Sequence, residues 1–260
     1  MVIYQPYEVI IIGGAAVGHL IISSSPSLLK EVIGQILSVL KGKEPTKEFY
    51  QEVLMLLYEL TKTAKGNLLA LEPHIENPEN SDIFNRYPQV SGNHHAVEFL
   101  CDTLKVQISS PMSPFDLEEL MDKDMAAAHA PEHQAYETIN RVSDAFPGLG
   151  IVAAVLGVVN TMGKLTMGKE VIGKSVAAAL VGTFLGILMC YGFAQPLAAK
   201  VNDNIEKEGK ILEVIKVGLL AFAKDCSPKV CVEFSRRSVP PHIRPSFAEI
   251  DEMTTNLKKS

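Results

Sequence analysis

The chain of 260 residues lacks the motifs that would mark an enzyme or a nucleic-acid-binding protein. It has no phosphate-binding loop, nucleophile elbow or metal-ligand motif, so we expect neither catalysis nor a bound cofactor. The net charge is −6 and no basic surface interleaved with aromatic residues is recognisable, which argues against nucleic acid as a partner. The four cysteines show no zinc or redox spacing, and we expect reduced thiols: Cys101, Cys190, Cys226 and Cys231.

The chain also lacks a convincing strand pattern and an internal repeat, so we predict an all-α protein. Hydrophobic residues make up 47% of the sequence and charged residues 21%, and the two kinds are segregated along the chain. This segregation predicts a polytopic membrane protein with a large water-exposed helical part.

Two apolar stretches near the middle contain no Asp or Glu. Residues 147–163 read PGLGIVAAVLGVVNTMG, and residues 175–199 read SVAAALVGTFLGILMCYGFAQPLAA. A helix over the second stretch would be roughly 37 Å long, more than the ~30 Å hydrocarbon core requires. The first stretch gives roughly 25 Å. We therefore predict a membrane hairpin, preceded by a third, shorter span over residues 8–25.

Small residues recur at helix-packing intervals in this hairpin. Gly182 and Gly186 stand four residues apart, and so do Ala153 and Gly157. Such spacing lets helix backbones approach closely in lipid, where the hydrophobic drive between helices is small. Pro196 removes a backbone donor, and we expect a bend there, near a membrane face.

The remaining sequence predicts amphipathic helices. Thr46 should cap a helix that ends at Gly66, Asn93 should begin another, and Ser113 should cap a third, whereas residues 77–92 should form a loop. Lys200, just past the last span, favours a cytoplasmic C-terminal part, although lysines in the hairpin turn favour the opposite orientation. We predict these boundaries: a periplasmic N-terminus at 1–7, spans at 8–25, 147–163 and 175–199, a periplasmic turn at 164–174, and cytoplasmic parts at 26–146 and 200–260.

The missing acid bears on mechanism. Proton or sodium coupling needs an ionisable or strongly coordinating group within the membrane, and the two hairpin spans offer only hydroxyls, an amide and Lys174 at the foot of the second. Two classes of function remain open, a scaffold around the ion-binding group of another protein and a channel or transporter acting alone. The absence of a carboxylate favours the scaffold, whose partner would supply the acid.

Several segments together resemble the flagellar stator subunits of the MotA/TolQ/ExbB family. They are the hairpin segments PGLGIVAAVLGVVNTMG and VGTFLGILMCYGFAQPLA, the tail VEFSRRSVPPHIRPSF, the loop GNLLALEPHIENPENSDIF and the segment YQPYEVIIIGGAAVG, which looks like the family's second span. The resemblance covers nearly the whole chain. It implies a non-enzymatic motor part in the lipid of the bacterial inner membrane, at the flagellar basal body.

The resemblance also implies partners. Five copies of such a subunit form a ring around two copies of MotB, whose membrane helix carries the proton-accepting Asp. Ion flow turns the ring, and the cytoplasmic loop pushes on the rotor switch protein FliG.

Individual roles follow from the family match alone. Pro147 and Pro196 correspond to the two prolines that couple ion flow to movement, and Thr183 corresponds to the hydroxyl beside the ion path. Ala154 stands where sodium-driven relatives tend to carry a Thr, which implies protons as the coupling ion.

Two charged residues match the family's rotor-contacting positions less completely. Glu72 matches the acidic position. The family's Arg is replaced by Ala64, and the adjacent Lys65 could supply the charge without the planar fork of Arg. A helix-end Lys on a solvated face is the alternative interpretation.

One departure concerns the start of the chain. Members of this family carry a span before the YQP segment, and none precedes it after Met1, so we predict three spans where the family usually has four. A misassigned start, a fragment and a shortened variant all remain open. The alternative function is a TolQ/ExbB-type subunit of an envelope energy-transducing complex, which the long loop and the RPSF tail disfavour. A soluble helical protein is a further alternative.

Overall fold

The computed structural model describes residues 6–41, 44–163 and 168–257, and all regular secondary structure in these ranges is helical. The all-α prediction is therefore confirmed. The chain divides into two compact units. Unit 1 comprises residues 1–42 and 130–205, and unit 2 comprises residues 43–129 and 206–260.

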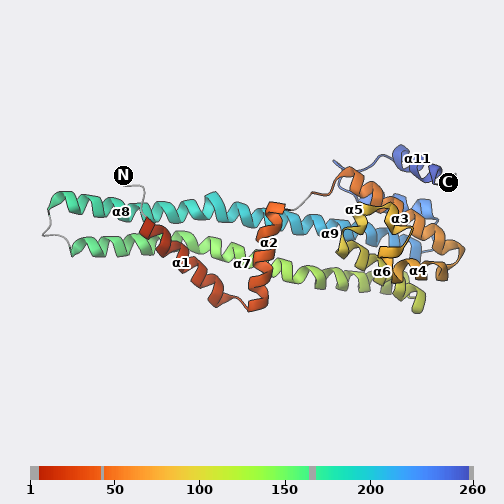
Figure 1. Ribbon diagram of the computed structural model, residues 1–260, viewed down its shortest axis with the longest axis horizontal. Helices are drawn as coiled ribbons and strands as arrows, with labels where there is room; N and C mark the ends of the chain where they lie inside the picture. Colours follow the sequence, from red (N-terminus) through yellow and green to blue (C-terminus); the bar gives the residue numbers. More distant parts are fainter. Residues whose placement is uncertain (1–5, 42–43, 164–167, 258–260) are drawn as a thin grey trace. The chain divides into compact units, whose positions relative to one another are not determined.

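Unit 1 contains the apolar helices. α1 (Pro6–Ser23) is followed by α2 (Pro26–Lys41), and the second part of α7 (Pro114–Met162) is followed by α8 (Lys169–Leu188), the π-helical turn η5 (Met189–Ala194) and the start of α9 (Gln195–Ala223). Figure 1 shows α7 and α8 side by side, and α1 packs against α8. Within the described ranges, three helices are long and apolar enough to cross a membrane, which agrees with the predicted number. The predicted periplasmic segments fall partly on residues 1–5 and 164–167, outside the described residues.

Proline shapes the two long helices differently. α7 continues through Pro131 and Pro147 as one helix, so the span predicted to begin at Pro147 is the last third of a longer helix. The π-helical turn η5 ends at Ala194, two residues before Pro196. Proline lacks an N–H and clashes with the carbonyl one turn earlier, and the wider π-helical turn ahead of Pro196 is one way to relieve that clash. The structure thus shows an irregular helical turn just before Pro196, while the bend expected there stays a prediction.

The predicted helix starts are also confirmed. The Thr46 hydroxyl accepts a hydrogen bond from the Phe49 N–H, at 3.2 Å, at the start of α3 (Lys47–Gly66). The Asn93 side chain caps α6 (His94–Ser109) in the same way. Each contact satisfies one of the backbone donors left free at a helix N-terminus.

The loop predicted at residues 77–92 is wrong in part. Short helical turns occupy much of the segment between α3 and α6: η1 (Leu68–Leu71), α4 (Glu72–Glu76), η2 (Pro78–Asn80), η3 (Phe84–Arg86) and α5 (Pro88–Ser91). The Glu52 carboxylate accepts hydrogen bonds from the Gln89 N–H at 2.8 Å and the Val90 N–H at 3.4 Å. A residue far away in sequence thus serves α5 as an N-terminal cap.

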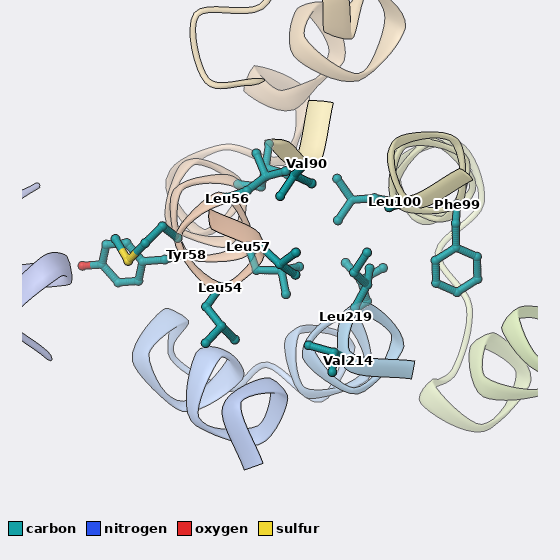
Figure 2. Close-up of a cluster of buried hydrophobic side chains, with 14 of the residues drawn as sticks. Leu54, Leu56, Leu57, Tyr58, Val90, Phe99, Leu100, Val214 and Leu219 are labelled. Carbon is teal, nitrogen blue, oxygen red and sulfur yellow. The ribbon is translucent and has the colours of Figure 1, made fainter. Parts of the chain in front are cut away.

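Unit 2 is built around the apolar face of α3. Figure 2 shows Leu54 and Leu57 of α3 facing Val214 and Leu219 of α9. The contact between α3 and α9 is close at Gly218, where an added Cβ atom would lie 3.1 Å from a methyl carbon of Leu57. α10 (Pro228–Ser238) packs on α3 as well.

Two cysteines lie within the core of unit 2. Burial raises the pKa of the Cys101 thiol to about 12 and that of the Cys231 thiol to about 11. All four cysteines are free, as predicted. Cys101 and Cys231 are therefore weak nucleophiles at neutral pH, since the reactive species is the thiolate.

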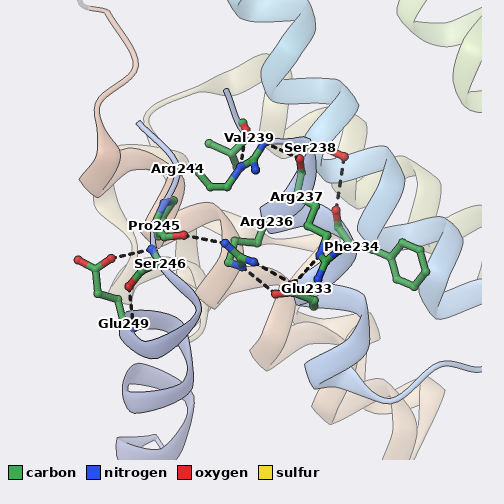
Figure 3. A network of polar contacts seen from close by, with 10 residues as sticks. All are labelled: Glu233, Phe234, Arg236, Arg237, Ser238, Val239, Arg244, Pro245, Ser246 and Glu249. Carbon is green, nitrogen blue, oxygen red and sulfur yellow. Dashed lines mark hydrogen bonds and ion pairs between the residues drawn. The ribbon is translucent and has the colours of Figure 1, made fainter. Parts of the chain in front are cut away.

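The tail is held by an arginine network (Figure 3). Arg236 donates two hydrogen bonds to the Glu233 carboxylate, at 2.7 and 2.9 Å, and a third to the carbonyl of Pro245, at 3.0 Å. These contacts lower the pKa of Glu233 to about 2, with the bond from Arg236 as the largest cause. Arg244 donates to the carbonyl of Val239 at 2.9 Å. The SRRSVPPHIRPS segment is therefore folded onto itself by charge-assisted hydrogen bonds.

The last helix, α11 (Phe247–Asn256), begins with a capping box. The Ser246 hydroxyl accepts from the Glu249 N–H, and the Glu249 carboxylate accepts from the Ser246 N–H. Glu249 also accepts from Lys47 Nζ at 2.6 Å, which links α11 to the first turn of α3. The bond from Lys47 is the largest of the causes that lower the pKa of Glu249 to about 2.

Candidate functional site

Helices α7 and α8 meet through glycine and alanine. A Cβ atom added at Gly186 would lie 2.6 Å from the carbonyl oxygen of Phe146, and one at Gly150 would lie 2.9 Å from the carbonyl oxygen of Gly182. A Cβ atom at Gly182 would lie 3.3 Å from that of Ala153. These separations are too short for larger side chains, so the backbones approach about as closely as glycine permits. The predicted packing of small residues in the hairpin is confirmed.

The same contact aligns two predicted ion-path residues. A Cβ atom at Gly182 would lie 3.3 Å from the backbone nitrogen of Ala154. Thr183 follows Gly182 directly, so Ala154 and Thr183 lie at one level of the helix pair, and both are half-buried. Residues 145–162 of α7 and 175–188 of α8 contain no acid, so this level has no carboxylate from its own two helices.

The two predicted coupling prolines lie away from this level, toward η5: Pro147 is about 10 Å along α7 from Ala154, and Pro196 is about 20 Å along the chain from Thr183. Gln195 donates a hydrogen bond to the Asp144 carboxylate at 3.4 Å, which brings the end of η5 alongside α7. Pro196 follows Gln195, and Pro147 lies three residues after Asp144. Pro147 is half-buried and Pro196 is exposed. A deformable turn thus stands between the ion-path level and the start of α9.

An acid of α1 also lies at this contact. Glu8, in the first turns of α1, is only 9% exposed, and its Oε2 atom is buried without a hydrogen-bond partner among the described residues. A Cβ atom added at Gly182 would lie 2.9 Å from this oxygen. The prediction of spans without an acid concerned residues 147–163 and 175–199 and holds for them, whereas Glu8 is the first residue of the predicted span 8–25. A signal was present, since Glu8 is the only acidic residue of α1.

The predicted rotor-contacting residues lie on unit 2, away from its core. Lys65, in the last turn of α3, is about half-exposed, and its Nζ atom lies 3.9 Å from a carboxylate oxygen of Asp225. Asp225 is 99% exposed, so the pair contributes little to stability. Glu72 begins α4 and is exposed. The geometry leaves Lys65 and Glu72 accessible to another protein without testing whether one binds there.

Two family models match the chain. Motility protein A N-terminal matches residues 1–67, and the MotA/TolQ/ExbB proton channel family matches residues 93–214. Motility protein A of Escherichia coli (strain K12) is 35% identical over 257 residues, which cover 98% of this chain and 87% of the relative. Chemotaxis protein LafT of Vibrio parahaemolyticus is 35% identical over 251 residues, covering 96% of this chain and 88% of the relative.

Solved structures share the fold. The flagellar MotAB stator complex from Bacillus subtilis contains a chain that superposes with a TM-score of 0.74 at 22% identity. The MotAB structure from C. jejuni gives a TM-score of 0.75 at 19% identity. In each case the match covers 94% of this chain and 88% of the other.

Proposed function

The chain belongs to the MotA/TolQ/ExbB proton channel family. From that premise we propose that it is a flagellar motor stator subunit that forms a proton channel with MotB. The observation that carries this function is the match to motility protein A along almost the entire chain. The helices add a physical reason, because α7 and α8 pack closely through small residues and their apolar parts, residues 145–162 and 175–188, contain no acid.

The partner supplies the proton-accepting group. A membrane helix of the MotB type would place its Asp at the level of Ala154 and Thr183, where the Thr183 hydroxyl can donate to or accept from a carboxyl group. Five copies of the chain would surround two copies of the partner in a ring. The half-burial of both residues within one copy supports a position that faces another chain.

Coupling to movement would run through η5. Protonation of the partner's Asp removes one charge from the centre of the ring, which changes the force on the surrounding helices. The π-helical turn before Pro196 is the place where α8 and α9 can change direction at low cost, since its backbone already departs from the α-helical pattern. Pro147 would have the same role on α7.

The motion would reach the rotor through unit 2. Lys65 and Glu72 carry opposite charges on accessible surface, and we propose that they contact the rotor switch protein FliG. The three apolar helices support a multi-pass protein of the inner membrane, and the stator function implies a position at the flagellar basal body.

The test uses a strain of Escherichia coli that lacks its own stator proteins. We expect the chain, produced with its MotB partner, to restore swimming, and a partner whose membrane Asp is replaced by Asn to fail. Swimming should stop when a protonophore is added and should not change when sodium is removed. Strict sodium dependence would refute protons as the coupling ion. Rapid, selective proton conduction by the chain alone in liposomes would refute the requirement for a partner's acid.

A further inference from the structure

We propose that Glu8 is a proton-binding site within the membrane-spanning part of the chain: its carboxyl group holds a proton at neutral pH while it lies against Gly182, and releases that proton to water only when α1 moves away from α8. The proposal rests on the proposed function only in assuming that unit 1 lies in a membrane. It concerns an acid of this chain and is separate from the Asp supplied by the partner.

The first observation is the burial of an unpartnered oxygen. Glu8 is 9% exposed, and Oε2 has no hydrogen-bond partner among the described residues. An ionised carboxylate in such a place would lose its hydration without gaining a donor or a cation in exchange, which is a large penalty. A protonated carboxyl carries no charge and avoids most of that penalty.

The second observation is the space that receives the carboxyl. A Cβ atom at Gly182 would lie 2.9 Å from Glu8 Oε2, so the absence of a side chain at position 182 leaves the room that the end of the Glu8 side chain occupies. Gly182 therefore has two contacts, with Ala153 of α7 on one side and with Glu8 of α1 on the other. We call this arrangement the Glu8–Gly182 contact.

In the described parts of α7 and α8, no charged side chain lies near Gly182 to offset the burial of Glu8. Residues 145–162 of α7 and 175–188 of α8 contain no titratable side chain. Lys174, the nearest cation along α8, is eight residues from Gly182, or about 12 Å along the helix, and it donates to Glu170. Asp144 is ten residues from Ala154 in α7, about 15 Å away by the same measure. Within α1, Tyr7 is 76% exposed and His19 is exposed.

The contact also has a mechanical consequence. Ile12 and Ala16, one and two turns after Glu8, pack in one cluster with Cys190 of η5. The ionisation of Glu8 would favour a position of its carboxyl group in water, which requires the start of α1 to leave α8. Proton release at Glu8 and exposure of Cys190 should therefore occur together.

The first experiment is infrared spectroscopy of the purified complex with its MotB partner at neutral pH. We expect a band from a protonated carboxyl that disappears in Glu8→Gln and persists in Glu170→Gln, a matched control whose carboxylate is 82% exposed. Absence of a band in the wild-type complex that depends on Glu8 would overturn the proposal. Loss of the band on addition of sodium at constant pH would also overturn it, because the ligand would then be a metal cation.

The second experiment follows alkylation of Cys190 by mass spectrometry as the pH is raised. The wild type should show a larger increase than Glu8→Gln, which keeps the shape of the side chain and cannot ionise. Equal pH dependence in the wild type and Glu8→Gln would overturn the link between proton release and movement of α1.

These measurements are independent of motility. If the wild-type complex shows the Glu8 band and yet restores no swimming, the proposed function fails and the proton-binding site stands. If it swims without such a band, the site is refuted and the function stands.

Discussion

Gly186 of α8 and Gly150 of α7 face each other so closely that a Cβ atom at position 186 would lie 2.8 Å from the Cα atom of Gly150. The atoms on both sides belong to the backbone, so neither can move aside without shifting a helix. The hairpin is therefore sensitive to a single methyl group at this crossing.

We expect Gly186→Ala to destabilise unit 1. Overpacking in a well-packed interior costs about 1–3 kcal/mol, and against rigid backbone it should exceed the ~1 kcal/mol that alanine gains over glycine in a helix. Thermal unfolding of the purified protein in detergent measures the difference. Gly173→Ala is the matched control in the same helix, because a Cβ atom there meets nothing within 4 Å. A melting temperature for Gly186→Ala equal to or above that of the wild type would contradict the packing argument.

The arginine network of the tail predicts a second difference. Arg236→Ala removes three hydrogen bonds and leaves the Glu233 carboxylate and the Pro245 carbonyl without those donors. A hydrogen bond to a charged group contributes about 1.5–3 kcal/mol to stability. We therefore expect Arg236→Ala to lower the free energy of unfolding by at least about 2 kcal/mol. Arg237→Ala is the control, since this residue also contacts Glu233 but its side chain is 74% exposed. Equal effects of the two substitutions in thermal unfolding would exclude a special role for Arg236.

Acid should weaken the same network. The pKa of Glu233 lies at about 2 in the folded chain, below its ordinary value of 4.5. A lowered pKa means that the group stabilises the fold fully above pH ~4.5 and that this stabilisation declines as the pH falls toward 2. Melting temperatures at several pH values between 5 and 2 should therefore fall more steeply for the wild type than for Glu233→Gln. Parallel slopes would show that Glu233 is not a source of the acid sensitivity.

The parts of the fold that depend on local sequence could be predicted. The caps at Thr46 and Asn93 require only the residue and its next three neighbours, and the apolar spans require only composition and length. The cap of α5 could not be predicted in this way, because its acceptor is Glu52, 37 residues before Gln89.

The candidate site shows the same limit. Ala154 and Thr183 were selected by family resemblance, and the structure places them at one level because Gly182 fits against α7. Glu8 is the first residue of the predicted span 8–25, and the sequence does not indicate whether its carboxyl group is buried. Its burial depends on packing against α8, which periodicity within α1 cannot reveal.

Lys65 and Glu72 carry opposite charges on the accessible surface of unit 2. If these residues contact a charged rotor surface, Lys65→Glu and Glu72→Lys should each reduce swimming strongly, because each reverses the sign of a charge at the contact. Lys65→Arg keeps the positive charge and should preserve swimming. Both side chains are accessible, so protein levels and membrane insertion should not change.

Asp225→Asn separates the two interpretations of Lys65. It removes the local ion-pair partner of Lys65 without touching Lys65 itself, and Asn tolerates the left-handed backbone of this residue, whose φ is 58°. Normal swimming of Asp225→Asn together with failure of Lys65→Glu would assign the effect to another protein. A second reference is Lys123→Glu, on a solvated stretch of α7 where Lys123 is 74% exposed. Should all of these variants swim like the wild type, Lys65 is a solvated helix-end lysine, and the rotor contact has to lie elsewhere on unit 2.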